Sequence, residues 1–311
     1  MKKYLAFALI ATSFLACKKS DVTKPETPFT NTPSVYTIDN DDVSILRQNL
    51  DGTAPKKLVV HQQDPGRNVF IADMSANSPA TKMAYLLRKG EPGNYVTELH
   101  LAAADGSNDH VLKTYKQNNV FPLMVKIGSN GVIYYTYRDF NTDDYQLYSI
   151  NENGTGETKI SSAFRSVTDI SADGKYVVAL SDFTNYIRLN YFDVASNGDF
   201  RNAIHNDQSI PGLQQARITP DGKKIIVLYL NYGIKCRIID LATKTFKDAT
   251  ITTGWADTFS YYMSLAPDND KIIFVAAGRS SSSSYVYSQT SGTVVQQFTN
   301  VTKGVNQGYI F

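Results

Sequence analysis

Apolar and polar positions alternate along this chain in short stretches, and polar turns separate the stretches at regular intervals. Three stretches place an Asp-Gly or Asp-Asn turn between an apolar strand and a second, more apolar strand: ISADGKYVVALSD (170–182), ITPDGKKIIVLYL (218–230) and LAPDNDKIIFVAA (265–277). Asp and Gly supply the local hydrogen bond and the positive φ that tight hairpins require. Weaker copies stand at 78–87 and 127–137. The pattern predicts five β-hairpins.

A second strand signal follows each hairpin, alternating in polarity and ending in a polar turn. These segments are 95–108, 145–156, 187–198, 234–245 and 284–293. The turns are 48 residues apart from Asp173 to Asp221 and 47 apart from Asp221 to Asp268. A period of this length, with four strand signals and no amphipathic helix pattern, is typical of β-propeller blades. Each blade is a four-stranded antiparallel sheet that covers its apolar faces by stacking on its neighbours.

The two ends of the folded region predict a sixth blade. Residues 34–60 have the pattern of second, third and outer strands without an inner strand before them, and residues 305–311 supply a single strand with nothing after it. We expect the C-terminal strand to complete the first blade, because this pairing removes two open sheet edges. The predicted fold is an all-β propeller of six four-stranded blades over residues 35–311. A seventh blade would need a degenerate copy, and the remaining loops are too short for one.

The repeated motif resembles a known family. The motif consists of a Ser/Thr-Pro/Ala-Asp-Gly-Lys turn, an apolar strand, and then a strand that ends in Asp-Gly or Asn-Gly. It is similar to the repeat of TolB-like (WD40-like) β-propellers, and the resemblance covers nearly all of residues 35–311. The resemblance implies the fold and not the function, because the matching residues form turns and core. That group includes envelope interaction proteins and accessory domains of peptidases and lyases. No functional residue carries over from it.

The N-terminus predicts export and a lipid anchor. Two lysines at positions 2 and 3 precede an apolar run, 4–16, which is too short to cross a hydrocarbon core of about 30 Å. Cys17 follows, and its surroundings resemble the lipobox of Bacteroidota lipoproteins, although Phe14 stands where leucine is usual. We therefore expect a signal peptide at 1–16, a lipidated Cys17, and a Pro- and Thr-rich flexible tether to residue 34. An ordinary secretory signal with an incidental cysteine is the alternative.

The charge of the chain argues against nucleic-acid binding, and its cysteine content excludes an intrachain disulfide. The chain has 31 Lys and Arg and 29 Asp and Glu, and loss of residues 1–16 removes two lysines (31 − 2 = 29). A neutral mature chain argues against nucleic-acid binding, which needs a basic surface. Only Cys236 remains beyond Cys17, so no intrachain disulfide is available. The apolar sequence around Cys236 predicts a buried thiol.

Motifs for catalysis are weak in this sequence. The run GRSSSSS (278–284) lacks the second glycine of a G-x-S-x-G nucleophile elbow and has the composition of a solvated loop. The chain has four histidines, with no two at the spacing of metal ligands, and each is predicted to be a structural or surface residue: His61, His100, His110 and His205. We predict no catalytic residue and no cofactor.

One acidic loop is a weak candidate for calcium. Asp139, Asn141 and Asp143 occupy alternate positions, the spacing at which calcium loops present oxygen ligands. The loop departs from the EF-hand pattern because Asp144 replaces the usual glycine and Ile150 the usual glutamate. A solvated hairpin loop explains the same residues, and no metal site is predicted with the histidines.

The loops that lead into the inner strands are the candidate ligand site. In a propeller these loops converge on one mouth of the central channel. Here they carry amides, guanidinium groups and aromatic rings, which suit sugar rings or extended peptides. The candidate residues are Arg67, Asn68, Asn118, Asn119, Arg165, Gln214, Gln215, Trp255, Tyr261, Asn306 and Gln307. The alternative is that these loops are polar only because they are solvated.

The sequence therefore predicts an envelope-anchored, non-catalytic binding module for a protein partner or a glycan. Its expected location is the outer membrane, through the lipid on Cys17, with the propeller facing the periplasm or the cell surface. Two other functions stay open. One is a polysaccharide lyase or hydrolase-like enzyme with an unfamiliar site, and the other is a structural scaffold that makes its contacts through the sides of the blades.

Overall fold

The computed structural model describes most of the chain after residue 33. The described residues are 34–39, 43–49, 56–77, 81–91, 93–116, 120–128, 130–139, 144–164, 166–183, 186–194, 201–202, 210, 212–253, 258–266, 268–278, 282–299 and 308–310. They form 24 β-strands, and no helix among them is long and apolar enough to cross a membrane. The predicted signal peptide, Cys17 and the tether lie outside the described residues.

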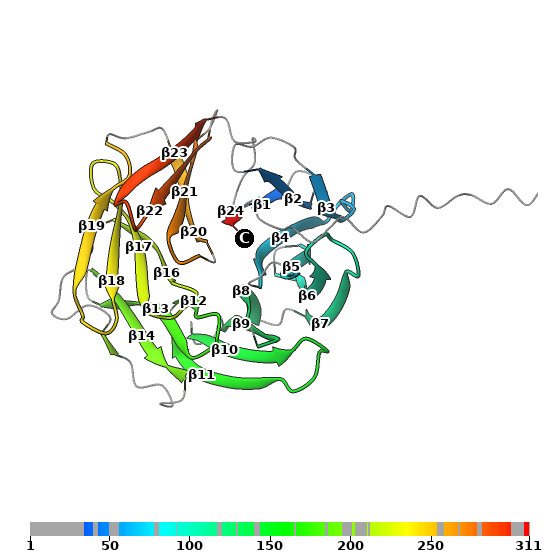
Figure 1. Ribbon diagram of the computed structural model, residues 1–311. Coiled ribbons are helices and arrows are strands. Elements are labelled where there is room, and N and C mark those ends of the chain that lie inside the picture. The colour runs from blue at the N-terminus through cyan, green and yellow to red at the C-terminus, as the bar shows by residue number, and fades with distance from the viewer. Residues whose placement is uncertain are drawn as a thin grey trace, which may run out of the picture. The chain divides into compact units, whose positions relative to one another are not determined.

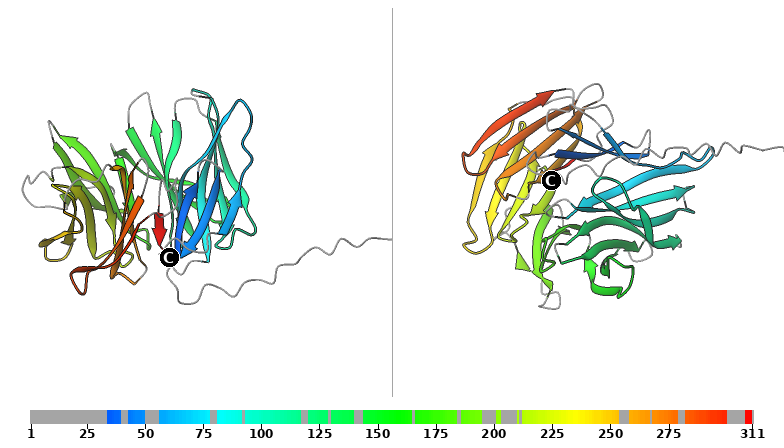
Figure 2. Two further views of the ribbon diagram at one scale, coloured as in Figure 1. Left: turned by 90° about the horizontal axis from the view of Figure 1, so that it is seen from above. Right: turned by 45° about the vertical axis from the view of Figure 1, so that its right-hand side comes forward.

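The strands form four-stranded sheets that stand around a common centre (Figures 1 and 2). The first strand of each sheet lies nearest the centre: β4 (Asn68–Ala76), β8 (Val120–Ile127), β12 (Ser166–Ile170), β16 (Leu213–Ile218), β20 (Thr258–Leu265) and β24 (Gly308–Ile310). The second strands are β5 (Lys82–Gly90), β9 (Val132–Asp139), β13 (Tyr176–Phe183), β17 (Lys224–Leu230), β21 (Lys271–Gly278) and β1 (Ser34–Asp39).

The other two positions in each sheet lie progressively farther from the centre. The third strands are β6 (Val96–Ala103), β10 (Asp144–Asn151), β14 (Tyr186–Asp193), β18 (Ile234–Asp240), β22 (Ser282–Ser288) and β2 (Ser44–Asn49). The outer strands are β7 (His110–Lys116), β11 (Thr158–Phe164), β15 (Arg201–Asn202), β19 (Phe246–Thr250), β23 (Thr293–Thr299) and β3 (Lys56–Val60). All neighbours pair antiparallel, as in propeller blades.

The repeated Asp-Gly turns join inner and second strands, as the sequence pattern predicts. In the β16–β17 hairpin the N–H of Thr219 donates to the carbonyl of Lys224 at 2.9 Å. Asp221 accepts hydrogen bonds from the Thr219 hydroxyl at 2.6 Å and from the N–H of Lys223 at 3.1 Å. Gly222 takes the positive φ of 69° that this turn needs. The all-β propeller class and the five predicted inner hairpins are confirmed.

The first and last strands of the described chain belong to one sheet. β24 pairs antiparallel with β1 through Val35 with Ile310, Tyr36 with Tyr309, and Thr37 with Gly308. β1 continues into β2 and β3, so the order of this sheet is β24-β1-β2-β3. The other five sheets each contain four strands that are consecutive in the sequence.

The cores lie between neighbouring sheets rather than within them. One core joins Tyr36 and Ile45 of the β24-β1-β2-β3 sheet to Met74 and Tyr85 of the next sheet. Another joins Ile226 and Cys236 of one sheet to Phe274 of its neighbour. Burial of such apolar surface contributes about 25 cal/mol for each Å² removed from water. Stacking thus covers apolar faces that a single sheet leaves exposed.

Candidate functional site

The inner strands line the central channel with one polar residue each near their C-terminal ends. In each strand, this residue comes two positions before the residue whose backbone N–H donates to a carbonyl on the other side of the hairpin turn. The five equivalent residues are Ser75, Lys126, Asp169, Arg217 and Ser264, and they line one cavity together with Asp73. Because strand residues alternate in direction, the position two residues earlier faces the same way. The channel lining is therefore set by the strand register.

Channel-facing side chains also tie two of the inner strands to the next one, β4 to β8 and β12 to β16. Asp73 Oδ2 accepts a hydrogen bond from the N–H of Val125 at 2.8 Å, and Asp169 Oδ2 accepts one from the N–H of Ile218 at 3.0 Å. These donors lie on the following blade, 52 and 49 residues later. The bonds satisfy backbone groups that the inner edge of a sheet would otherwise leave unpaired.

Three of the charged residues in this cavity, Lys126, Asp169 and Arg217, are paired with one another. Lys126 Nζ lies 3.1 Å from Asp169 Oδ1, and a guanidinium nitrogen of Arg217 lies 3.9 Å from the same oxygen. That nitrogen also donates to the Thr168 carbonyl at 2.9 Å. The Asp169 side chain is 1% exposed, so its negative charge depends on these partners. The arrangement is that of a structural ion-pair network.

The volume of the cavity limits what it holds. It measures about 60 Å³, which is enough for a few water molecules. Binding sites for small organic ligands usually have volumes of about 300–1,000 Å³. A sugar ring therefore does not fit in this cavity.

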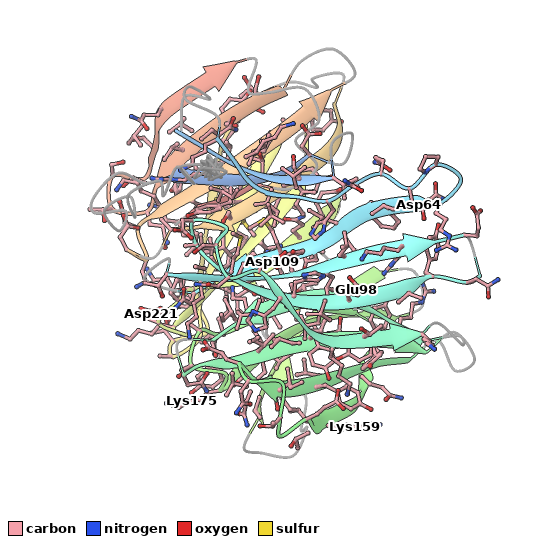
Figure 3. All side chains as sticks on the ribbon, turned by 90° about the vertical axis from the view of Figure 1, so that its right-hand side faces the viewer. Asp64, Glu98, Asp109, Lys159, Lys175 and Asp221 are labelled. Atoms are coloured by element: carbon pink, nitrogen blue, oxygen red, sulfur yellow. The ribbon has the colours of Figure 1, made fainter. Side chains whose placement is uncertain are left out.

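The predicted rim residues that the structure describes with their side chains, Arg67, Asn68, Gln214 and Gln215, lie at the opposite end of the inner strands. We call this side the inner-start face and the side with the Asp-Gly hairpin turns the turn face. In Figure 3, Asp64, which precedes β4, lies at the opposite edge from Asp221 and Lys175 of the turn face. Arg67 and Asn68 are exposed on the inner-start face, and the Arg67 guanidinium lies 3.6 Å from Asp64.

Two predicted glutamines at the start of β16 have different surroundings. Gln214 is exposed, and its amide nitrogen donates to the Gly212 carbonyl at 3.2 Å. Gln215 is half-buried, and its amide oxygen accepts a hydrogen bond from the N–H of Met263 on the next inner strand at 2.9 Å. Gln215 therefore contributes to the contact between blades, and Gln214 is the one available to a ligand.

The remaining predicted residues cannot be placed in the same way. Tyr261 and Asp139 belong to β20 and β9, but only their backbone is described. The other predicted rim, calcium and histidine positions lie outside the described residues: Asn118, Asn119, Asn141, Asp143, Arg165, His205, Trp255, Asn306 and Gln307. The calcium candidate and most of the rim stay predictions.

An exposed tyrosine on the inner-start face was not predicted from the sequence. Tyr232 lies in the turn between β17 and β18, is 78% exposed, and has a φ of 51°. A bulky residue in this left-handed region costs on the order of 1 kcal/mol. The N–H of Leu230 donates to the Gly212 carbonyl at 2.9 Å, so the turn adjoins the segment that carries Gln214. The turn with the aromatic ring thus adjoins the start of the strand that carries the Gln214 amide.

The fold brings together two of the four histidines. The rings of His61 and His100 are 5.3 Å apart between centroids, although 39 residues separate them in the chain. Burial lowers the pKa of His61, and the nearby His100 lowers it further. His110 is exposed, and its Nδ1 lies 2.8 Å from the Asn108 carbonyl. No metal-ligand spacing along the chain indicates the contact between His61 and His100.

Comparison with known proteins supports the fold alone. No family model matches the sequence, and no curated protein matches it either. Among solved structures, the chain is similar to a protein assigned as TolB from Agrobacterium tumefaciens, with a TM-score of 0.54 and 11% identity over 90% of this chain and 97% of that one. It is also similar to an oligogalacturonate lyase in complex with manganese, with a TM-score of 0.54 and 13% identity over 80% of this chain and 72% of that one.

A third similar structure belongs to a longer protein. The chain matches a puromycin hydrolase with a TM-score of 0.56 and 15% identity, covering 83% of this chain and 42% of the hydrolase. Identities this low establish a shared architecture and carry no residue roles. The likeness to TolB-like β-propellers expected from the turn motif is therefore supported at the level of the fold.

Proposed function

We propose that this chain is a non-catalytic binding module that holds a glycan or a protein partner on its inner-start face. The observation that carries the proposal is Tyr232, whose ring is 78% exposed at a φ of 51°. A left-handed φ at an exposed aromatic residue is a strained feature of the backbone, and we infer from it a contact outside the chain. Aromatic faces stack on sugar rings and on extended peptides.

The neighbours of Tyr232 suit a polar polymer. Gln214 lies on the adjacent strand and is exposed. A side chain at Gly233 would lie 2.2 Å from the Thr252 carbonyl, so the Tyr232 turn packs against the segment that leads toward Trp255. An amide and an aromatic ring fix the orientation of a sugar through hydrogen bonds and stacking. The proposed ligand-binding surface comprises Gln214, Tyr232 and the predicted rim residues.

A closed ring of six blades would make this face rigid. The pairing of Val35 with Ile310 and of Tyr36 with Tyr309 supports such a ring, because it places the last strand in the same sheet as the first. The ring holds the loops of separate blades at fixed distances from one another. We propose that the C-terminal strand closes the ring for this reason.

The channel gives little support to an enzyme. The two cations in its lining, Lys126 and Arg217, both lie against the buried Asp169. The cavity of about 60 Å³ does not admit a sugar ring. A lyase or a hydrolase would therefore need a site on the loops.

The location proposed for the module is the bacterial outer membrane. The apolar run 4–16 and the Cys17 that follows support a lipid anchor. The propeller would then stand on the tether 18–34, facing the periplasm or the cell surface.

Binding to an array of plant and host polysaccharides tests this function. The chain from Pro25 to Phe311 would be compared with Tyr232→Ala and with a variant in which Arg165, Gln214 and Trp255 are replaced by alanine. We expect wild type to retain a glycan class, and both variants to lose at least tenfold in affinity. Phe246→Ala is the matched control, since Phe246 is an exposed aromatic residue on the outer strand β19.

Three results would change the assignment. Equal retention by wild type and both rim variants would move the contact to the sides of the blades. Cleavage of a retained polysaccharide, seen as new reducing ends or unsaturated products, would make the protein an enzyme. Retention of an envelope protein that Tyr232→Ala fails to bind would keep the site and identify the ligand as a protein.

A further inference from the structure

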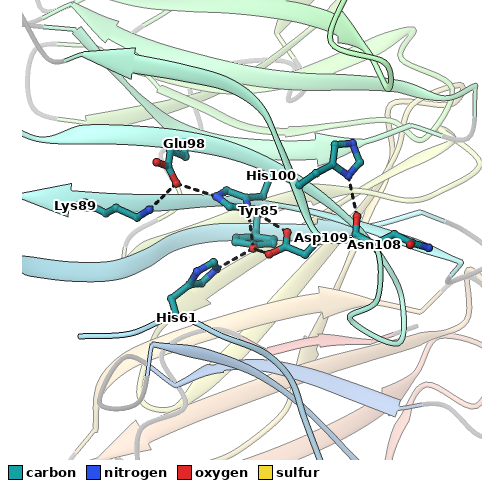
Figure 4. Close-up of polar contacts among 8 residues, drawn as sticks. His61, Tyr85, Lys89, Glu98, His100, Asn108 and Asp109 are labelled. Carbon is teal, nitrogen blue, oxygen red and sulfur yellow. Dashed lines mark hydrogen bonds and ion pairs between the residues drawn. The ribbon is translucent and has the colours of Figure 1, made fainter. Parts of the chain in front are cut away.

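Nitrogen and oxygen atoms of three side chains surround the hydroxyl of Tyr85 at the contact between the first two blades (Figure 4). The Tyr85 oxygen lies 2.8 Å from His61 Nε2 and 3.0 Å from His100 Nδ1. It donates to Asp109 Oδ2 at 2.7 Å. His100 Nδ1 is also 3.1 Å from Asp109 Oδ1. Two nitrogens and a carboxylate thus surround one oxygen atom.

Different elements position each member of this group. His61 follows the outer strand β3, Tyr85 and His100 lie on β5 and β6 of the next sheet, and Asp109 ends the turn before β7. The turn lies directly against β3, because a side chain on Gly106 would come within 2.0 Å of the Leu58 carbonyl oxygen. This close approach brings Asp109 to His61. The group therefore depends on the packing of two sheets.

The second nitrogen of His100 has a carboxylate partner. His100 Nε2 lies 3.0 Å from Glu98 Oε2, and Lys89 Nζ donates to the same carboxylate oxygen at 2.8 Å. One oxygen of Glu98 thus meets both the Lys89 ammonium and His100 Nε2. The other ring nitrogen of His100, Nδ1, faces Tyr85 and Asp109. Metal-binding histidines are commonly oriented by a carboxylate in this way.

The four polar side chains of this group include one carboxylate and no lysine or arginine, and the nearby Lys89 ammonium is bonded to Glu98. The Tyr85 hydroxyl has one proton, and the hydrogen bond to Asp109 uses it. A cation among the four would balance the charge of the Asp109 carboxylate and accept lone pairs from the nitrogen and oxygen atoms that face one another.

We propose that His61 Nε2, His100 Nδ1, the Asp109 carboxylate and the Tyr85 oxygen bind one divalent first-row transition-metal ion, with Zn²⁺ as the representative. The ligand atoms of the two histidines and Asp109 all lie within 4.8 Å of one another. Around a tetrahedral ion with bonds of about 2.0–2.1 Å, ligand atoms are about 3.4 Å apart. To form such a site, the Tyr85 oxygen must withdraw from between the other ligands, and ligand atoms that lie up to 4.8 Å apart must approach one another by as much as about 1.4 Å.

The chemistry of the donors favours zinc and its neighbours over calcium or magnesium. Imidazole nitrogen suits Zn²⁺, Co²⁺, Ni²⁺ and Cu²⁺, whereas Ca²⁺ and Mg²⁺ prefer sites made of oxygen. Asp109 provides access for the ion, since its side chain is 25% exposed while that of His100 is 7% exposed. The ion would join the end of β3 to β5 and β6. It would therefore clamp the blade that contains both the first and the last strands.

Metal titration of the full chain, stripped with a chelator, tests the proposal. Co²⁺ is the first probe because a tetrahedral site with nitrogen and oxygen ligands gives intense visible bands. We expect one Co²⁺ per chain, displacement by one equivalent of Zn²⁺, and a Tm that rises by several degrees when Zn²⁺ is present. Glu98→Gln should lower the affinity about 10–100-fold without abolishing binding, because it alters only the orientation of His100.

Matched variants separate this site from other donors in the chain. His61→Gln and Asp109→Asn should each lose the visible bands and the rise in Tm. His110→Gln should behave as wild type, because His110 is exposed and contacts only the Asn108 carbonyl among the contacts found for it. Asp109→Asn keeps the size of the side chain and one acceptor oxygen while removing the charge, so it serves if His61→Gln fails to fold.

Two outcomes would overturn the proposal. One is the absence of stoichiometric Co²⁺ or Zn²⁺ binding by wild type, which would show that these side chains form only a hydrogen-bonded contact between the blades. The other is unchanged binding by both His61→Gln and Asp109→Asn, which would place the ion elsewhere in the chain.

Discussion

The carboxylate of Asp169 accepts a hydrogen bond from the backbone N–H of Ile218, 3.0 Å away on the next inner strand. Asp73 bonds Val125 in the same manner at 2.8 Å. These side chains replace the backbone pairing that the inner strands cannot make with each other. They hold neighbouring blades in register around the channel.

Loss of the Asp169 carboxylate should destabilise the propeller. Asp169→Ala leaves the Ile218 N–H without its acceptor, and leaves Lys126 and Arg217 without the carboxylate between them. We expect the free energy of unfolding to fall by about 3 kcal/mol, as measured by chemical denaturation. The exposed Asp64 is the control, and Asp64→Ala should cost less than about 0.5 kcal/mol. Equal losses for both variants would contradict the proposed role of Asp169.

Gly174 should be intolerant of any side chain. Its φ is 72°, and a Cβ would lie 1.8 Å from the Tyr134 hydroxyl. Gly174→Ala therefore combines backbone strain with a steric clash, at a cost of about 3 kcal/mol. Gly66 also has a positive φ, of 95°, but a Cβ there meets nothing within 4 Å. Gly66→Ala should cost only about 1 kcal/mol, and thermal melts of the two variants would reveal the difference.

Acid should weaken the contact between the second and third blades. Burial raises the pKa of Glu157, but hydrogen bonds from Lys113 and Tyr135 outweigh it and lower the pKa below its ordinary value of 4.5. Because the folded state holds the ionised form, this contribution is present above pH 4.5 and is lost as the pH falls through the lowered folded value. Glu157→Gln should therefore reduce stability at pH 7 more than at pH 3.

Urea denaturation at both pH values measures that difference. Glu91→Gln, which removes a carboxylate from an exposed side chain, is the control for the change in net charge. If the stability difference between wild type and Glu157→Gln is the same at pH 7 and pH 3, the assignment of this pH dependence to Glu157 is wrong.

Cys236 should be unreactive until the propeller opens. The side chain is 0% exposed, and burial raises its thiol pKa to about 12. In the chain from Pro25 to Phe311 it is the only cysteine. We expect a disulfide reagent at pH 8 to label the native protein only at the rate of unfolding, and the denatured protein at once. Rapid labelling of the native protein would contradict the buried position.

Replacement of Tyr232 should raise the stability of the protein and weaken its binding. Tyr232→Asn places a residue that tolerates the left-handed region at the φ of 51°, so the free energy of unfolding should rise by about 1 kcal/mol. The same change should lower glycan or partner affinity, because it removes the exposed ring. Parallel melting and binding measurements would detect the opposite signs. A loss of stability would show that the ring supports the fold.

The sequence alone determines much of this fold, because its signals are local. The Asp173-Gly174 and Asp221-Gly222 turns predict the inner hairpins, and the repeat length predicts the blades. The buried thiol of Cys236 also follows from its apolar neighbours and is confirmed. A turn depends on a few consecutive residues, and strand alternation on a period of two, so both can be recognised in one sequence.

Only the tertiary structure decides which side chains meet between blades. His61, Tyr85, His100 and Asp109 come together because two sheets stack and the Gly106 turn lies against β3. Asp169 meets Ile218 for the same reason, through packing between sheets. The left-handed φ of Tyr232 is likewise set by a turn packed between Gly212 and Thr252. The contacts between blades depend on sheet twist and stacking distance, which no spacing along the chain records.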